Sequence, residues 1–484
     1  MISENIRVRF APSPTGYLHI GGLRTALYNY LLAKHNNGTF ILRIEDTDRN
    51  RFVEGAVENL IDTLEWAGLD YDEGPVKGGP YGPYMQSERL NIYKENIDIL
   101  LSEKKAYYCF CTQERLTEVR EKFQREGLQP MYDKHCLHLS EDEVNEKLAR
   151  NIPHVVRLNV EPDKQIVLND SVRGEVIFNS SIVDDQILIK SDGYPTYHLA
   201  NVVDDHLMKI THVIRGEEWL PSTPKHIILY DYFGWEKPVF AHLPLLLNPD
   251  KSKLSKRQGD VAVEDYRSKG YLKEALVNFV ALLGWNFADD KEFYLMDELI
   301  EKFSLEGVNK AGGVFNIEKL NWLNAEHLRS KSLSELITLL REELNHTKYS
   351  DKEYNDEFLG HVIEAMKERV AFIKEIPEKG FYFFEEPEKY DEEVVKKRWK
   401  PDSAGHLKLL SGEFSKLNDP SKEDFENVLR QTAENLGTGT GKLIHPLRLA
   451  VSGVGGGPGV FDILYIIGKE KTINRLNKAI EKLG

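Results

Sequence analysis

Hydrophobic and polar residues alternate at the start of the chain. Residues 6–11 have a period of two, which predicts a β-strand, and the prolines and glycine of residues 12–16 predict a loop after it. Apolar residues then recur with helical spacing over 23–31, and a second strand is predicted at 39–44. This order of strand, helix and strand predicts two parallel neighbouring strands in an open α/β sheet.

The pattern changes twice further along the chain. From 92 to 196, helical periodicity mixes with β-rich runs such as 155–160, which predicts an α+β domain inserted into the α/β domain. After residue 260 helical spacing repeats with almost no strand alternation, so the C-terminal half is predicted to be all-α. The glycine-rich residues 453–459 lack the lysine and hydroxyl of a phosphate loop, and we expect an inter-helix loop there.

Composition narrows the class of protein. A chain of 484 residues with 41% hydrophobic content can bury several cores, about three domains by length. No apolar run reaches about 18 residues, and the N-terminus lacks the pattern of a signal peptide, so we expect a cytoplasmic protein without a membrane partner. The net charge of −15 disfavours a nucleic-acid partner, but a local basic face remains compatible with one.

Two segments have residues suited to phosphate chemistry. His19 precedes the first predicted helix, and Gly21 and Gly22 leave its backbone N–H groups open to a nucleotide. Residues 253–257 (KLSKR) place three cations and a hydroxyl in a turn-rich stretch, where they can stabilise charge on transferring phosphates. Taken singly, each has a plainer alternative: a helix start with a surface histidine, and a solvated basic loop.

Together, in this order and about 230 residues apart, the two segments resemble the signature pair of class I aminoacyl-tRNA synthetases. Residues 9–16 (RFAPSPTG), 43–48 (RIEDTD), 192–198 (DGYPTYH) and 215–219 (RGEEW) resemble the glutamyl and glutaminyl branch. Gly22 stands where many class members have a second histidine, and Leu254 and Arg257 replace Met and Ser. The glutamyl branch is similar at all three positions, so the chain resembles bacterial glutamyl-tRNA synthetases.

The resemblance implies a Rossmann-like parallel sheet with an inserted α+β domain, followed by an all-α half. It also implies a monomer with ATP, L-glutamate and tRNA(Glu) as partners and Mg²⁺ as a cofactor. The implied domains are 1–91 with 197–250 (catalytic), 92–196 (acceptor-stem binding), 251–335 (stem contact), and 336–395 and 396–484 (anticodon binding).

The implied site residues follow from matching motif positions. Free glutamate has two carboxylates and one ammonium, so a selective pocket needs two cations and one anion. Arg9, Arg215 and Glu45 match those roles, and which arginine meets which carboxylate stays open. The full set is His19, Lys253 and Lys256 for catalysis; Gly21, Gly22, Glu218, Trp219, Ser255 and Lys256 for ATP; and Arg9, Ser13, Glu45, Tyr197, Asn201 and Arg215 for glutamate.

The three cysteines of the chain lie close together in sequence. Cys109, Cys111, Cys136 and His138 form two short clusters of zinc-type ligands, and three thiolates with an imidazole predict a closed, structural Zn²⁺ site. Some bacterial glutamyl-tRNA synthetases are similar in this region. Three unrelated buried cysteines are the alternative, and His135 competes with His138 as a ligand.

Other functions fit the sequence less well. A glutaminyl enzyme would have β-barrels in place of the helical half, a short paralogue that glutamylates a tRNA base would lack that half, and a non-catalytic RNA-binding protein would not need His19 and Lys256. Arg369 falls near the family position where arginine favours enzymes restricted to glutamate tRNA, and we expect it to bind the anticodon. A solvated helical arginine is the alternative.

Overall fold

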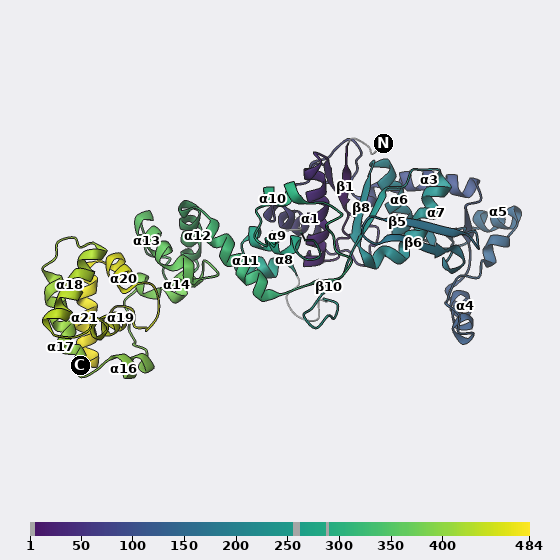
Figure 1. Cartoon of the computed structure of the whole chain (residues 1–484). Coiled ribbons are helices and arrows are strands. Elements are labelled where there is room, and N and C mark those ends of the chain that lie inside the picture. The colour runs from purple at the N-terminus through teal and green to yellow at the C-terminus, as the bar shows by residue number, and fades with distance from the viewer. Residues whose placement is uncertain (1–4, 255–261, 287–289) are drawn as a thin grey trace. The chain divides into compact units, whose positions relative to one another are not determined.

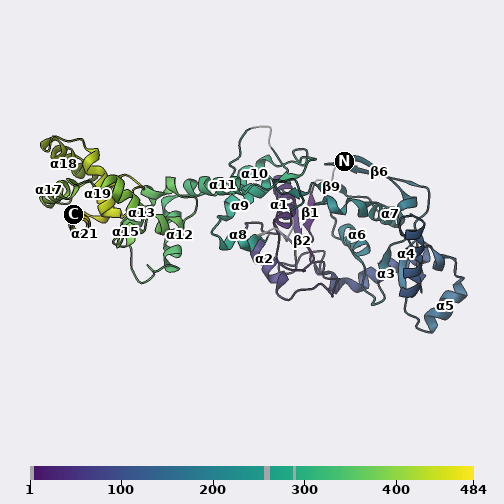
Figure 2. The same cartoon turned by 90° about the horizontal axis from the view of Figure 1, so that it is seen from below.

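The computed structural model describes residues 5–254, 262–286 and 290–484. The chain divides into two compact units (Figures 1 and 2). The N-terminal unit comprises Met1–Lys269 and Lys273–Ile317, and the helical unit comprises Gly270–Leu272 and Glu318–Gly484. The finer five-part division stays a prediction. Within the described residues, every helix is too short or too polar to span a bilayer.

A six-stranded sheet forms the centre of the N-terminal unit, in the order β2-β1-β8-β9-β5-β6. Strands β1 (Arg7–Phe10) and β2 (Thr39–Leu42) are parallel and are joined by α1 (Ile20–His35), which confirms the predicted β-α-β unit. Helix α1 is buried along most of its length because it packs on the sheet and also on α9 (Lys273–Ala281) and α10 (Met296–Lys302).

The order of the strands reverses between β1 and β8 (His212–Gly216). From β1 the chain crosses to β2 on one side, whereas from β8 it crosses through α7 (Thr223–Phe233) to β9 (Val239–Leu243) on the other side. Right-handed crossovers therefore place α1 and α7 on opposite faces of the sheet, and α6 (Tyr197–Leu207) packs beside α7 (Figure 1). A crevice at the carboxyl ends of β1 and β8 is the expected ligand position in such a sheet.

Two strands from the predicted insertion belong to this main sheet. Strand β5 (Gln165–Asp170) is parallel to β9, and β6 (Gly174–Asn179) is antiparallel to β5, so the predicted Rossmann-like parallel sheet is extended by one antiparallel edge strand. The reason is the alternating pattern of β5, whose Ile166 and Leu168 join the core cluster that also contains residues of α7.

The rest of the range 92–196 forms a separate layer. An antiparallel sheet joins β3 (Ala106–Cys109), β4 (Val155–Leu158) and β7 (Ile187–Ile189). The remaining helices and short strands of the N-terminal unit are α2 (Ala56–Trp66), α3 (Leu90–Ser102), α4 (Gln113–Arg125), α5 (Glu141–Ala149), α8 (Val263–Ser268), β10 (Leu246–Leu247) and β11 (Gly313–Val314).

The described part of the helical unit has no strand, as the periodicity predicted. Residues 453–459 connect two of its helices, which confirms the predicted inter-helix loop. The side chain of Ser332 accepts a hydrogen bond from the Glu335 N–H in a capping box that starts α12. The helices are α11 (Ile317–Ser330), α12 (Leu333–Asn345), α13 (Asp356–Met366), α14 (Glu375–Lys379), α15 (Phe381–Phe384), α16 (Glu392–Arg398), α17 (Ser403–Ser415), α18 (Lys422–Asn435), α19 (Gly441–Ser452), α20 (Val460–Ile467) and α21 (Lys469–Leu483).

Candidate active site

A cavity of about 850 Å³ opens at the point where the strand order reverses. Its volume lies within the range of small-molecule sites. The predicted residues that line it are Arg9, Ser13, His19, Gly21, Gly22, Glu45, Tyr197, Asn201, Arg215, Glu218, Trp219 and Lys253. The fold therefore brings the predicted ATP and glutamate residues together. Ser255, Lys256 and Arg257 lie outside the described residues.

His19 caps the helix that begins at this cavity. Its Nδ1 accepts a hydrogen bond of 2.9 Å from the Gly22 N–H, which makes His19 the N-cap of α1. A Cβ atom on Gly21 would lie 3.1 Å from His19 Nδ1, and one on Gly22 would lie 2.6 Å from Leu18 Cδ1. A side chain at either position would crowd this compact turn, in which the positive end of the helix lies at the cavity, an arrangement that suits an anionic ligand.

The described residues that flank 255–261 lie close to the start of α1. Before it, Lys253 bridges to Leu247, and Lys253 and Leu254 line the cavity. After it, Ala262 forms an antiparallel bridge with His19, and the next N–H donates to the Leu18 carbonyl over 2.9 Å. The described residues on either side of 255–261 therefore lie near the start of α1.

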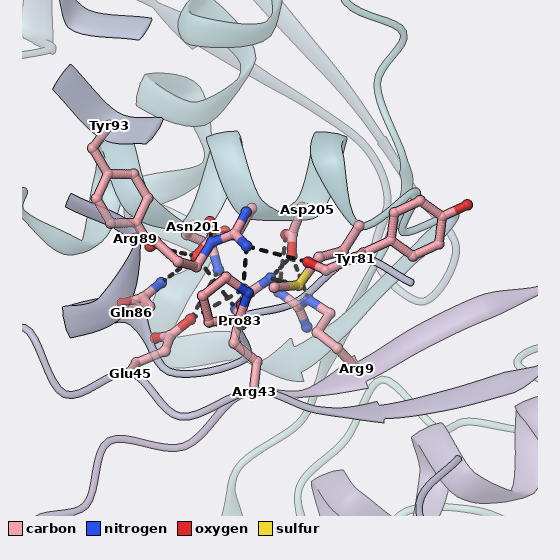
Figure 3. Close-up of polar contacts among 12 residues, drawn as sticks. Arg9, Arg43, Glu45, Tyr81, Pro83, Gln86, Arg89, Tyr93, Asn201 and Asp205 are labelled. Carbon is pink, nitrogen blue, oxygen red and sulfur yellow. Dashed lines mark hydrogen bonds and ion pairs between the residues drawn. The ribbon is translucent and has the colours of Figure 1, made fainter. Parts of the chain in front are cut away.

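Buried ion pairs support the floor of the cavity (Figure 3). Arg9 donates to Asp205 through Nε (3.0 Å) and Nη2 (3.3 Å), and Arg43 donates to Asp205 over 2.7 Å and to Glu45 over 3.1 Å. Burial opposes ionisation of Asp205, but Arg9 and Arg43 outweigh it and hold the pKa of that carboxyl below its usual range. Arg9 therefore reaches the cavity with its charge already paired.

The neighbouring Asp204 completes this network. It accepts hydrogen bonds from Arg89 Nε (2.7 Å), Gln86 Nε2 (2.9 Å) and the Tyr93 hydroxyl (2.8 Å). Each of these side chains is buried. Because a buried carboxylate is costly unless its oxygens are satisfied, these contacts allow consecutive aspartates to sit inside α6.

Arg215 has a different environment from Arg9. It is only 5% exposed, yet its donors meet neutral groups: the Tyr197 hydroxyl (3.0 Å), His226 Nδ1 (3.2 Å), Thr223 Oγ1 (2.9 Å) and His242 Nε2 (3.0 Å). Within the described residues, no carboxylate forms an ion pair with Arg215. Its positive charge is thus held in place and available to a carboxylate ligand.

Glu45 supplies the negative charge in the same cavity. It is buried, and burial raises its pKa above the usual range, although Arg43 and Arg9 partly offset that shift. A bound ammonium would further favour the charged form, because it adds a cationic partner to Arg43 and Arg9. Arg9, Arg215 and Glu45 therefore present the two cations and one anion that an amino dicarboxylate requires.

An aromatic wall lies at the other side of Arg215. The rings of Tyr197 and Trp219 are 4.3 Å apart between centroids, and Trp219 is 38% exposed. Glu218 is next to it in the 3₁₀ helix η4 (Glu217–Ser222), and both residues line the cavity. An exposed indole face beside a carboxylate can accept a nucleoside by stacking and hydrogen bonding.

The three cysteines converge at the end of β3. Their sulfur atoms lie within 4.8 Å of one another, and Cys111 and Cys136 are 3.6 Å apart. Four ligands at tetrahedral Zn–S distances place sulfur atoms roughly 3.8 Å apart, so this geometry suits zinc. The Tyr132 hydroxyl lies 3.4 Å from Cys109 Sγ and 3.3 Å from Cys111 Sγ.

His138 is not part of this group of ligand atoms. Cys136 and His138 both belong to the 3₁₀ helix η2 (His135–His138), in which consecutive side chains are about 120° apart. Residues two positions apart in such a helix point in different directions. The structure brings the three sulfurs together without either histidine, and His138 as the fourth ligand, with His135 as its competitor, stays a prediction.

A second cavity, of about 550 Å³, lies in the helical unit. Arg369, at the end of the 3₁₀ helix η6 (Lys367–Arg369), lines it together with Tyr465 of α20 and His361 of α13. Arg369 is exposed, and the Tyr465 ring packs edge-on against His361 with centroids 5.2 Å apart. An exposed cation beside an accessible aromatic ring is a typical surface for an unpaired base.

Comparison with known proteins decides the family. Residues 5–322 match the model of the tRNA synthetases class I (E and Q), catalytic domain, and residues 332–480 match the model of an anticodon binding domain. The chain belongs to the class I tRNA synthetases. Glutamate–tRNA ligases of Chloroherpeton thalassium and Chlorobaculum parvum are 54% and 51% identical to it; each match covers 100% of this chain and 99% of the relative.

Solved structures agree with this assignment. A glutamate tRNA ligase from Elizabethkingia meningosepticum, crystallised in complex with its amino acid, superposes with a TM-score of 0.95 at 44% identity. The match covers 99% of this synthetase and 100% of that chain. The fold of a class I synthetase, with a Rossmann-like N-terminal domain and a helical anticodon-binding domain, is thereby confirmed.

Sequence reasoning missed several residues of the synthetase site. Asp205 had a usable signal, because Tyr197, Asn201 and Asp205 are spaced by four and share one face of α6. No sequence signal pointed to His242 or Asp170. They lie on β9 and β5, and their contact depends on the position of β5 in the sheet.

Proposed function

We infer that this chain is a glutamate–tRNA ligase, which activates L-glutamate with ATP and transfers it to the terminal adenosine of tRNA(Glu). The observation that carries this inference is one cavity that combines Arg9, Arg215 and Glu45 with a helix N-terminus capped by His19. The first group matches free glutamate, and the second suits the phosphates of ATP.

In the first step, a carboxylate oxygen of glutamate attacks the α-phosphorus of ATP, and the bond to pyrophosphate breaks. Arg9, Arg215 and Glu45 hold the amino acid in line, and the residues proposed to stabilise the developing phosphate charge are His19, Lys253 and Lys256. Mg²⁺ bound with ATP neutralises phosphate oxygens. In the second step, the 2′-hydroxyl of tRNA attacks the glutamyl carbonyl carbon and AMP leaves.

A charging assay tests the function directly. The purified chain should attach radiolabelled glutamate, and not glutamine, to tRNA(Glu) in the presence of ATP and Mg²⁺. Lys256→Ala should lower the rate of adenylate formation far more than it raises KM for glutamate, because the lysine acts on phosphate charge. Equal losses in both quantities would contradict the role of Lys256, and no charging by the wild-type chain would contradict the function.

We also propose a structural Zn²⁺ held by Cys109, Cys111 and Cys136, with the Tyr132 hydroxyl next to the fourth coordination position. The close sulfur atoms support this proposal, as do the hydrogen bonds from Cys136 and Tyr132, which hold the pKa of Cys109 well below its usual range. When bound, the metal would tie the end of β3 to η2.

Elemental analysis of tag-free protein tests the zinc site. About one zinc per chain is expected. Tyr132→Phe should weaken zinc retention against a chelator, whereas His138→Ala should leave it unchanged, because His138 lies outside the cluster. A loss confined to His138→Ala would restore the histidine as the ligand, and a folded, metal-free wild-type protein would reject the site.

Anticodon recognition is proposed for the cavity of the helical unit. Arg369 would donate to a base edge there, and Tyr465 would stack on a neighbouring base. Charging assays with purified glutamate and glutamine tRNAs test whether the enzyme is restricted to tRNA(Glu), as Arg369 suggests. Equal glutamylation of both tRNAs would contradict that restriction.

A further inference from the structure

A pair of buried residues lies directly behind Arg215, on the side away from the cavity. His242 is 0% exposed and Asp170 is 4% exposed. His242 Nδ1 and Asp170 Oδ2 are 2.6 Å apart, and His242 Nε2 accepts from Arg215 Nε over 3.0 Å. The chain of contacts thus runs from a carboxylate through an imidazole ring to the guanidinium that is proposed to bind glutamate.

The hydrogen bonds determine which ring nitrogen of His242 carries the proton. Arg215 Nε always carries hydrogen, so His242 Nε2 must present a lone pair to it. The proton of the neutral ring is then on Nδ1, where it donates to Asp170. Burial is the largest cause that lowers the pKa of His242, and the positive Arg215 acts in the same direction, which keeps the ring neutral.

The orientation of Asp170 is determined independently. Its Oδ1 accepts three backbone N–H groups, from Val172 (3.0 Å), Arg173 (2.9 Å) and His242 (3.2 Å). Oδ2 is therefore the oxygen that faces the ring. Burial opposes ionisation of Asp170, but the hydrogen bond with the His242 ring and the backbone N–H groups of Arg173 and His242 outweigh it and hold the pKa of this carboxyl below its usual range. An ionised carboxylate in this position can only accept, so it selects the Nδ1–H tautomer.

We propose that Asp170 and His242 are positioning residues: together they present a fixed acceptor to Arg215 Nε and so orient its guanidinium for the substrate carboxylate. This proposal rests on the proposed function, in which Arg215 binds glutamate. It also gives a role to the extension of the sheet by β5, because β5 ends at Asp170 and places it beside β9.

Asp170→Asn tests the proposal with little change of shape. The three backbone N–H groups hold the amide oxygen in place of Oδ1, so the amide nitrogen faces His242 Nδ1 and donates to it. The ring must then carry its proton on Nε2, where it opposes the Arg215 N–H. KM for glutamate should rise about 10- to 100-fold, whereas KM for ATP should stay within about twofold.

His242→Gln provides the rescue. A glutamine amide oxygen can take the place of the Nε2 lone pair without depending on Asp170, so this variant should stay within a few-fold of wild type. In the His242→Gln background, Asp170→Asn should then raise KM for glutamate little further. A purely structural role for Asp170 predicts the same loss in both backgrounds, and that result would overturn the proposal.

Selective ¹⁵N-histidine labelling gives a readout that does not depend on activity. The His242 signal, assigned by its absence in His242→Gln, should report Nδ1–H in the wild type and Nε2–H in Asp170→Asn. An unchanged tautomer would overturn the inference, as would a changed tautomer with unchanged KM for glutamate. If the wild-type chain charged no tRNA, that result would contradict the proposed function. The tautomer of His242 could still be measured, so the two failures are distinguishable.

If Asp170→Asn alone failed to fold, as judged by circular dichroism, His242→Asn would replace it. This variant keeps a partner for Asp170 but removes the acceptor from Arg215, and it should raise KM for glutamate by the same 10- to 100-fold. An unchanged KM in this variant would overturn the proposal.

Discussion

The two units of this synthetase differ in where they place charge. The N-terminal unit buries Arg9 and Arg43 against Asp205 beneath its cavity. The helical unit has an apolar core that includes Leu410 and Phe414. Burying a charge lowers the free energy of unfolding unless the charge is well paired. The difference between the units therefore indicates that the N-terminal unit gives up some folding stability to form a polar site.

A buried arginine of the helical unit supports this comparison. Arg475 is buried there, but it donates to the backbone carbonyls of Tyr382, Val451 and Glu385. Arg475 therefore connects backbone segments of the helical unit and has a structural role. The buried ion pairs of Arg9 and Arg43 with Asp205, by contrast, lie beside one cavity.

The largest expected effect comes from removing the positive charge of Arg215. Arg215→Gln should lower kcat/KM for glutamate about a thousandfold, because a buried charge that pairs with the substrate carboxylate is lost. Steady-state charging assays at varied glutamate measure this. A loss below tenfold would show that the neutral surroundings of Arg215 do not make it the main anchor.

The next effect concerns stability. Asp205→Asn should lower the free energy of unfolding of the N-terminal unit by about 3–5 kcal/mol, because Arg9 and Arg43 lose their shared carboxylate. Since the folded pKa of Asp205 is depressed, its contribution is present above the unfolded value of about 3.9 and is lost as pH falls through the folded pKa. The difference in the free energy of unfolding between wild type and Asp205→Asn should therefore become smaller only below about pH 4.

Phe414→Ala in the helical unit is the matched control for that measurement. It removes a fully buried ring and should cost about 3–5 kcal/mol, with no dependence on pH. Hydrogen exchange followed by mass spectrometry separates the two units. A pH-independent loss in Asp205→Asn would mean that its carboxylate is not stabilised by the arginines.

A smaller effect is expected at the proposed anticodon site. Arg369→Ala should raise KM for tRNA about tenfold, because one base contact is lost, and should leave KM for glutamate unchanged. Charging assays at varied tRNA measure it. A change in KM for glutamate instead would indicate that Arg369 does not act through the anticodon.

The smallest effect is expected at a surface ion pair of α17. Lys416, whose side chain is 68% exposed, contacts Glu413 over 2.8 Å. Lys416→Ala should change the free energy of unfolding by less than about 0.5 kcal/mol and leave charging unchanged, because water already solvates both partners. A loss as large as that of Asp205→Asn would erase the contrast between buried and exposed pairs.

Much of the site could be predicted because its parts are local. His19, Gly21 and Gly22 follow one strand and begin one helix, and this arrangement depends only on neighbouring residues. Tyr197 and Asn201 are one helical turn apart on α6. The cysteine cluster shows the limit, since the structure brings together the three sulfurs that the spacing predicted, whereas His138 as a fourth ligand stays a prediction.

The sequence by itself determined the family, the β-α-β start, the helical C-terminal half and the residue types proposed to bind glutamate and ATP. Only the tertiary structure decided that Arg9 is paired with a carboxylate and that Arg215, among the described residues, is not. It also placed Asp170, 72 positions from His242, behind Arg215. The physical reason is that strand order sets such contacts, and strand order follows from the packing of the whole sheet.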